Sequence, residues 1–140
     1  MEGFRHQTKI QVRFKDIDAM GHVNNANHFT YFELARVSYF DDVVKLPIDW
    51  SRQGIILAKM SINYKSPIFL KDQVTVWCRV SRFGNTSFDC DYAITCDREG
   101  KTIVAAEGTS TQVCFDYEKN SPYPVPDSWK KCAQEFESGN

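Results

Sequence analysis

The stretch over residues 28–45 would carry apolar side chains nearly all the way around a helix. They are Phe29, Phe32, Leu34, Ala35, Val37, Tyr39, Phe40, Val43 and Val44. A helix with so wide an apolar surface must be enclosed on most sides, and in a chain of 140 residues the enclosing element can only be a sheet wrapped about it. Asn27 is the predicted N-cap, and Pro47 is expected to end the helix soon after its last turn.

Most of the remaining chain alternates between apolar and polar residues with the period of two that is typical of strands. A first strand is predicted over residues 10–14, before the helix. Four more are predicted after it, over residues 56–64, 74–81, 86–96 and about 102–115, and most of them are joined by short hairpins. The parity of the last strand is ambiguous between Ile103 and Ala106, and Gly108 is expected to mark a bulge that switches its register.

The order of strand, buried helix and four antiparallel strands predicts one α+β domain over residues 1–140. Its curled antiparallel sheet is expected to wrap around a single long helix. A single curled sheet of this size leaves an open edge strand and an open flank. Pairing with a second copy is therefore expected, because it would cover both.

Composition excludes several classes of function. A net charge of −1 and a pI near 6.3, without a basic stripe, argue against a nucleic-acid partner. No apolar run approaches the roughly 20 residues that span a bilayer, and the first residues lack the apolar core of a signal peptide, so a cytoplasmic protein without a membrane partner is expected. The five cysteines are irregularly spaced, which favours free thiols over disulfides or a zinc site; Cys90 and Cys96 are predicted core residues.

The loop over residues 16–25 is the predicted functional site. It follows a strand that would hold Asp18 in place, and it precedes a helix whose unpaired N–H groups point at the same space. Gly21 would let the backbone turn without a side-chain clash. A carboxylate beside a site for an oxyanion suggests acyl transfer. Asp16 is expected only to accept hydrogen bonds from N–H groups of the turn, as aspartates in turns often do.

The motif Asp-Ile-Asp-Ala-Met-Gly-His-Val-Asn-Asn over residues 16–25, with the aromatic helix that follows, resembles the hotdog-fold acyl-CoA thioesterases related to 4-hydroxybenzoyl-CoA thioesterase. Residues 62–67, Asp72, Val74, residues 115–116 and residues 124–126 extend this resemblance over most of the chain. It implies a hotdog fold and hydrolysis of acyl-CoA, with no cofactor and no metal. It also implies a homodimer or a dimer of dimers.

The resemblance places Asp18 in the catalytic position, as a nucleophile or as a general base, and the Asn25 N–H in the position of the oxyanion donor. The expected substrate-binding residues are Gly21, His22, Val23, Asn24, Tyr31 and Arg82. Phe29, Phe32 and Tyr31 could limit the length of the acyl chain. Arg82 would contact the phosphates of coenzyme A, and Glu33 is expected to be a buried hydrogen-bonding partner.

Two alternatives stay open. One is an acyl-carrier-protein thioesterase, whose acidic partner would favour a basic surface. The other is a hotdog module that binds acyl-CoA without hydrolysing it, which the intact Asp18 disfavours.

Overall fold

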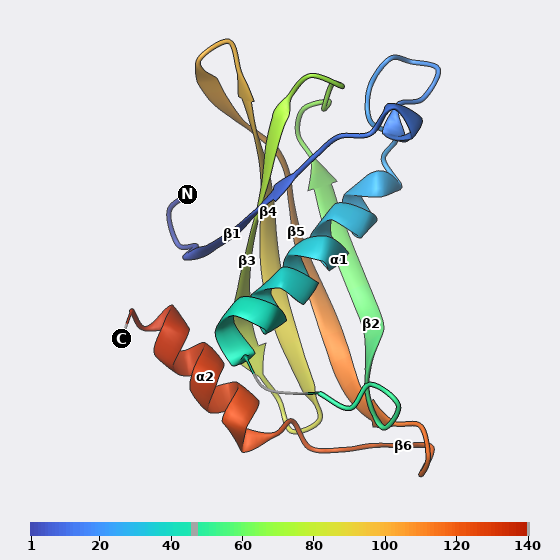
Figure 1. Cartoon of the computed structure of the whole chain (residues 1–140), viewed down its shortest axis with the longest axis vertical. Helices are drawn as coiled ribbons and strands as arrows, with labels where there is room; N and C mark the ends of the chain where they lie inside the picture. Colours follow the sequence, from blue (N-terminus) through green and yellow to red (C-terminus); the bar gives the residue numbers. More distant parts are fainter. Residues whose placement is uncertain (46–47, 140) are drawn as a thin grey trace.

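The computed structural model describes residues 1–45 and 48–139. Two α-helices and a curled sheet make up most of the fold (Figure 1). The strands are β1 (His6–Ile10), β2 (Gln53–Tyr64), β3 (Gln73–Phe83), β4 (Ser87–Arg98), β5 (Lys101–Asp116) and the short β6 (Ser121–Pro122); the helices are α1 (Asn27–Tyr39) and α2 (Asp127–Glu137).

The strands are antiparallel, in the order β1-β3-β4-β5-β2, with β6 paired to β5. Helix α1 lies across one face of this sheet, and α2 lies beside β3 near the end of α1 (Figure 1). The predicted α+β architecture, a curled antiparallel sheet around a central helix, is confirmed.

The buried side of α1 carries Tyr31, Phe32, Ala35 and Tyr39, spaced so that they share one helix face. The Phe32 ring stacks on Tyr92 of β4 with 4.6 Å between centroids. Gly108 of β5 permits this packing, since a Cβ at residue 108 would lie 2.6 Å from Cε2 of Phe32.

Two expectations about α1 were wrong. Ala26 occupies the N-cap position, and Asn27 is the first helical residue. Phe29, Leu34 and Val37 are exposed on the outer side, so one chain does not enclose the helix completely. The helix continues into a π-helical turn, η2 (Phe40–Val44), and Lys45 then adopts a φ of +56°. Pro47, expected to end the helix, lies outside the described residues.

The first strand and the bulge also differ from expectation. Strand β1 ends at Ile10, and Phe14 lies in a 3₁₀ turn, η1 (Phe14–Asp16), where it is 83% exposed. The bulge in β5 falls at Ala105, because β4 pairs with Ala106 and then with Val104. Gly108 keeps regular register with both neighbouring strands. The bulge lets Ala105 and Ala106 both be buried.

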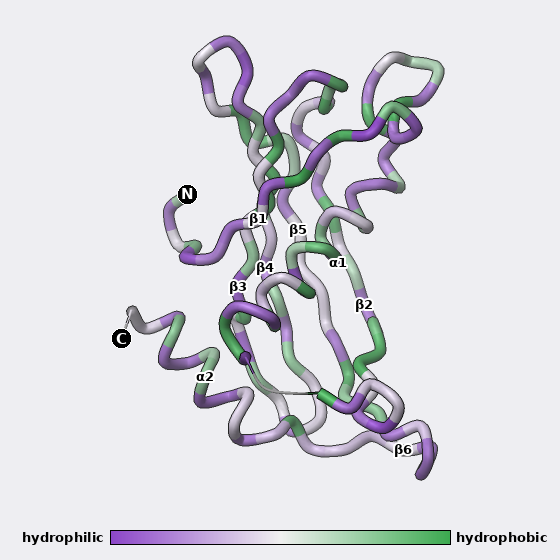
Figure 2. Tube along the Cα trace, in the orientation of Figure 1, coloured by the Kyte–Doolittle hydropathy of each residue, from purple (hydrophilic) through white to green (hydrophobic). Residues whose placement is uncertain are grey.

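Strand β2 forms an edge of the sheet, and much of its length is exposed on both faces. The hydrophobic segment near its start, green in Figure 2, includes the exposed residues Ile56 and Leu57. An exposed apolar edge strand can pair with another chain. All five cysteines are free thiols, and Cys90 and Cys96 are core residues as predicted. Within residues 1–45 and 48–139, no helix is both long and apolar enough to cross a membrane.

Candidate active site

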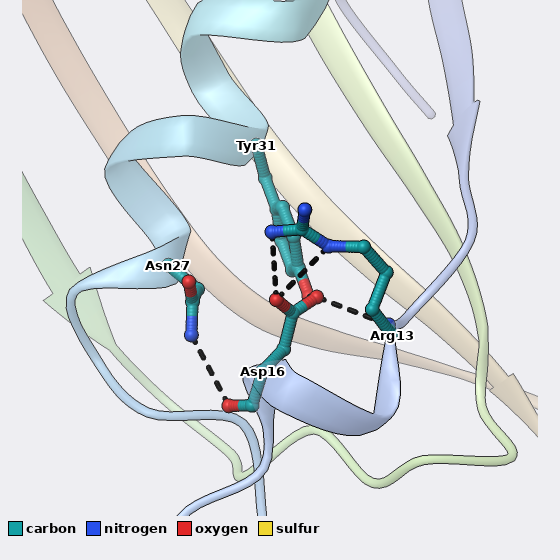
Figure 3. A network of polar contacts seen from close by, with 4 residues as sticks. All are labelled: Arg13, Asp16, Asn27 and Tyr31. Atoms are coloured by element: carbon teal, nitrogen blue, oxygen red, sulfur yellow. Dashed lines mark hydrogen bonds and ion pairs between the residues drawn. The ribbon is translucent and has the colours of Figure 1, made fainter.

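Asp16 is the structural anchor of the loop between β1 and α1 (Figure 3). Its side chain is 1% exposed and accepts hydrogen bonds from the Arg13 backbone N–H at 3.0 Å and from the Tyr31 hydroxyl at 2.8 Å. The Arg13 guanidinium adds contacts of 2.9 and 3.2 Å. The Asp16 carbonyl accepts from the side chain of Asn27 and from the backbone N–H of Asn24. Asp16 therefore joins the loop to the first turns of α1.

Burial acts to raise the pKa of Asp16, but the hydrogen bonds from Arg13 and Tyr31 outweigh it and hold this pKa below 3.8. Asp16 is thus a charged structural residue, and its predicted role in the turn is confirmed. Tyr31 was expected to bind substrate. The structure instead places Tyr31 in the core, 2% exposed, with its hydroxyl bonded to Asp16.

Asp18 begins a tight turn that is closed by a bridge between Ile17 and Val23. The Asp18 carbonyl accepts the Gly21 N–H at 3.0 Å, and the Asp18 N–H donates to the His22 carbonyl at 3.0 Å. Gly21 has a φ of +84°, a conformation that favours glycine and confirms its expected role in the turn. The buried Val23 donates its N–H to the Ile68 carbonyl at 2.7 Å, which fastens the turn to the loop after β2.

The two carboxylate oxygens of Asp18 have different partners. Oδ1 accepts the Met20 N–H at 2.9 Å, and Oδ2 lies 3.4 Å from the side-chain Nδ2 of Asn24. Asn24 also accepts the Ala26 N–H at 2.9 Å through its side-chain oxygen. Asn24 therefore joins the Asp18 carboxylate to the start of α1, where Asn27 had been expected to act as the cap.

The backbone N–H of Asn25 lies on the same loop as Asp18. Among the described residues, it has no hydrogen-bond acceptor. Asn25 is exposed and comes just before α1, so its N–H lies near the positive end of the helix dipole. An unpaired N–H in such a place can bind an anion or a developing oxyanion.

A pocket of about 300 Å³ opens beside this loop. It brings together three of the predicted residues, His22, Val23 and Asn25. The other lining residues are His28, Tyr64, Lys65, Ser66 and Pro67. Asp18, Gly21 and Asn24 lie on the adjoining turn and are not part of the lining.

His28 and Tyr64 were not predicted as site residues. Their rings meet edge to face with 4.8 Å between centroids, and the Tyr64 hydroxyl donates to the Asn25 carbonyl at 3.0 Å. Burial lowers the pKa of His28 below 6.5, although backbone carbonyls of Asn24 and Asn25 oppose the shift. The sequence signal that could have found Tyr64 is its place at the end of β2, directly before Lys65-Ser66-Pro67.

Arg82 lies far from Asp18 within one chain. β1 leads into the Asp18 loop beside Val74 of β3, and Arg82 is eight residues farther along that strand. At about 3.3 Å per residue, Val74 and Arg82 are roughly 26 Å apart along β3. Arg82 is exposed and makes a weak ion pair of 3.5 Å with Asp89.

A larger groove of about 810 Å³ follows the outer face of α1 and η2. It is lined by Glu33, Arg36, Val37, Phe40, Asp41, Lys45, Ile48, Trp50 and Ile55. Glu33 is exposed in this groove, so the expectation that it is buried was wrong. Phe32 was expected to limit chain length, but it is fully buried in the core; Phe29 is exposed and does not line the groove.

Over the part of the chain that the structure describes, no group of three or more His, Cys, Asp or Glu side chains is placed to hold a metal ion. The site consists of an aspartate, a backbone N–H without an acceptor among the described residues, and an adjoining pocket; the groove with apolar walls lies farther along α1, from Glu33 onward.

Comparison with known proteins assigns the family. A model of the Thioesterase-like superfamily matches residues 12–132. The long-chain acyl-CoA thioesterase FadM of Escherichia coli K12 is 29% identical over 113 residues, which cover 79% of this chain and 83% of FadM. A thioesterase from Thermus thermophilus, solved with coenzyme A and zinc, is 33% identical with a TM-score of 0.83, and the alignment covers 100% of this chain and 99% of that one.

A 1,4-dihydroxy-2-naphthoyl-CoA thioesterase from Synechocystis has the same fold, with a TM-score of 0.82 at 20% identity over 94% of this chain and 97% of that one. The curled sheet and its central helix are thus a hotdog fold, and the class of protein is thioester hydrolase. The chain belongs to the Thioesterase-like superfamily.

Proposed function

We propose that this protein hydrolyses acyl-CoA to a free carboxylic acid and coenzyme A, with Asp18 and the Asn25 N–H as its catalytic groups. The observation that carries the proposal is the link through Asn24. Its side chain bonds to Asp18, and the next residue supplies the Asn25 N–H, which has no acceptor within residues 1–45 and 48–139. An oxygen nucleophile or base and an oxyanion donor are thereby held on one short loop.

Thioester hydrolysis requires few catalytic groups beyond these two. The Asp18 carboxylate either attacks the thioester carbonyl carbon or removes a proton from a water molecule that attacks it. The carbonyl oxygen gains negative charge, which the Asn25 N–H and the helix dipole would stabilise. The thiolate of coenzyme A then leaves and takes up a proton. On the general-base route the free acid forms directly; on the nucleophilic route a mixed anhydride with Asp18 forms, and water hydrolyses it to the free acid and the Asp18 carboxylate. Both routes use the same carboxylate and the same donor.

The nucleotide end of coenzyme A requires cationic groups. Lys65 supplies one on the wall of the pocket beside Asn25, where it forms a 3.0 Å ion pair with Glu107 and is about half exposed. Arg82 cannot reach the same pocket within one chain. A contact between Arg82 and coenzyme A would therefore need the pocket of a second copy.

The acyl group fits the groove of about 810 Å³ better than the smaller pocket. Val37, Phe40 and Trp50 provide apolar walls for a hydrocarbon chain. The relative FadM is named a long-chain acyl-CoA thioesterase, which supports a long acyl chain as the occupant of this groove.

A homodimer is part of the proposal. The outer face of α1 and the edge strand β2 both carry exposed apolar side chains, among them Val37 and Leu57. A second copy that paired along β2 would cover these residues and the open edge together. Sedimentation velocity would test this, and a monomer at micromolar concentration would contradict it.

The experiment that tests the function is a thiol-release assay with acyl-CoA substrates of different chain lengths. Asp18→Asn should lower kcat by about 10²-fold or more, since loss of the nucleophile or base removes the main route. Asp116→Asn is a matched control, because Asp116 also accepts backbone N–H groups of a turn, from Glu118 at 2.9 Å and Lys119 at 3.1 Å. It should retain wild-type turnover.

Equal turnover by wild type and Asp18→Asn would remove Asp18 from the mechanism. Saturable acyl-CoA binding without thiol release would instead identify a non-catalytic module. Assays with the same acyl group on coenzyme A and on acyl-carrier protein would separate the two thioesterase activities. The proposal requires the higher kcat/KM for the coenzyme A thioester.

A further inference from the structure

Tyr64 ties the edge strand β2 to the loop that carries Asn25. It is the last residue of β2, and it is held there by pairing with Ala106 of β5. Its hydroxyl donates to the Asn25 carbonyl at 3.0 Å, and its ring packs against the edge of His28. Burial raises the pKa of Tyr64 above 10.0, so the hydroxyl keeps its proton at neutral pH and acts as a donor.

The peptide groups on both sides of Asn25 are anchored. The Asn24 carbonyl accepts the Asn27 N–H at 2.9 Å. In a trans peptide this fixes the Asn25 N–H in the opposite direction. The Asn25 carbonyl belongs to the next peptide, and it accepts both the Tyr64 hydroxyl at 3.0 Å and the His28 N–H at 3.3 Å. The Tyr64 bond is the shorter of the two and comes from a different element of the fold.

We infer that Tyr64 is a positioning residue for thioester hydrolysis. By holding the Asn25 carbonyl, it holds the backbone at Asn25 at the angle that directs the N–H toward the oxyanion. The inference rests on the proposed function, because Tyr64 would act through the Asn25 donor. Such a donor works only within a narrow range, about 2.7–3.1 Å from the developing oxyanion. A small rotation of this loop should therefore lower the rate of the chemical step.

The test compares Tyr64→Phe with Tyr123→Phe. The Tyr123 hydroxyl donates to the Gly54 carbonyl at 3.3 Å, near the opposite end of β2. Both variants lose a hydroxyl that binds a backbone carbonyl of the loop or strand, and both keep the aromatic ring. Tyr64→Phe should lower kcat about tenfold with little change in KM, which is less than the 10²–10³-fold cost of removing an oxyanion donor outright. Tyr123→Phe should leave both constants within twofold.

A binding measurement separates positioning from a general loss of structure. An acyl-CoA analogue with a trifluoromethyl ketone in place of the thioester carbonyl can form a tetrahedral oxyanion, whereas a thioether analogue cannot. Tyr64→Phe should weaken binding of the ketone by about the same factor as it lowers kcat, because both depend on the oxyanion donor. Binding of the thioether should be unchanged.

The inference is overturned if Tyr64→Phe keeps wild-type kcat, if it weakens both analogues equally, or if Tyr123→Phe loses as much activity as Tyr64→Phe. These failures leave wild-type hydrolysis intact, so they would not affect the proposed function. If the wild-type protein releases no thiol from any acyl-CoA, the proposed function fails, and the role of Tyr64 fails with it.

Discussion

The Tyr31 hydroxyl donates a 2.8 Å hydrogen bond to the buried carboxylate of Asp16. Asp18, in the same loop, has no such contact with the core among the residues that the structure describes. Asp16 is saturated by Tyr31 and Arg13 and faces the interior (Figure 3). Asp18, only two residues later, turns outward and contacts Met20 and Asn24.

Removing the Tyr31 contact should destabilise the protein. We expect Tyr31→Phe to lower the free energy of unfolding by about 1–3 kcal/mol, because a buried carboxylate loses a hydrogen-bond donor. The effect should be much smaller in an Asp16→Asn background, where the charge is already absent. Urea unfolding of the two single variants and the double variant measures the coupling. Additive effects would contradict the contact.

His28 should make stability depend on pH in mildly acidic solution. Burial lowers its pKa in the folded protein below the ordinary 6.5, so the unfolded chain binds a proton first as pH falls. The stability associated with neutral His28 is therefore present above pH 6.5 and is lost as pH falls through the lower folded value. His28→Phe should lose less stability than wild type over that window. The same difference in unfolding free energy between wild type and His28→Phe at every pH would contradict this.

Asn24 should matter for both catalysis and the start of α1. Asn24→Ala loses the contacts to Asp18 and to the Ala26 N–H, so kcat should fall about tenfold and stability by about 1 kcal/mol. Asn24→Asp keeps an acceptor for Ala26 but cannot donate to Asp18. Asn24→Asp should therefore lower kcat about as much as Asn24→Ala does, but it should lower the stability less. Thiol release and thermal unfolding together measure both effects, and full activity of Asn24→Asp would refute the link to Asp18.

Lys65 should contribute to binding of the nucleotide end of the substrate. We expect Lys65→Gln to raise KM for acyl-CoA severalfold, since an exposed ionic contact contributes about 0.2–1 kcal/mol. KM for the matching acyl-pantetheine, which lacks the nucleotide, should not change. Lys119→Gln is the control and should alter neither value, because Lys119 lies in the turn after β5, at the opposite end of β2 from Lys65. An equal rise in KM for both substrates would assign Lys65 a different role.

The groove along α1 should limit the length of the acyl chain. Val37 lines it and is 54% exposed, so Val37→Trp would fill part of its volume. The ratio of kcat/KM for long to short acyl-CoA should fall about tenfold, because longer chains lose apolar contact area. Leu34→Trp adds the same ring to an exposed part of α1 outside the groove lining, and it should keep the wild-type ratio. An unchanged ratio in Val37→Trp would place the acyl chain elsewhere.

Local sequence patterns were enough to predict the order of the main elements and the position of the loop that carries Asp18. The period of two, the long apolar helix and Gly21 are local signals, and backbone geometry and side-chain alternation follow from local chemistry. The same alternation could not place the bulge in β5, because pairing with β4 decides whether Ala105 or Gly108 leaves the register.

Which side chains meet depends on the packing of the folded chain. Asp16 and Asp18 are the same residue type in the same loop, and the position of Tyr31 in the folded core distinguishes them. Tyr64 reaches Asn25 from a strand 39 residues away, a contact that no local pattern encodes. Arg82 and Asp18 are separated because β3 carries Arg82 to the other end of the sheet. Long-range packing sets these distances, and the chain acquires them only when the sheet closes around α1.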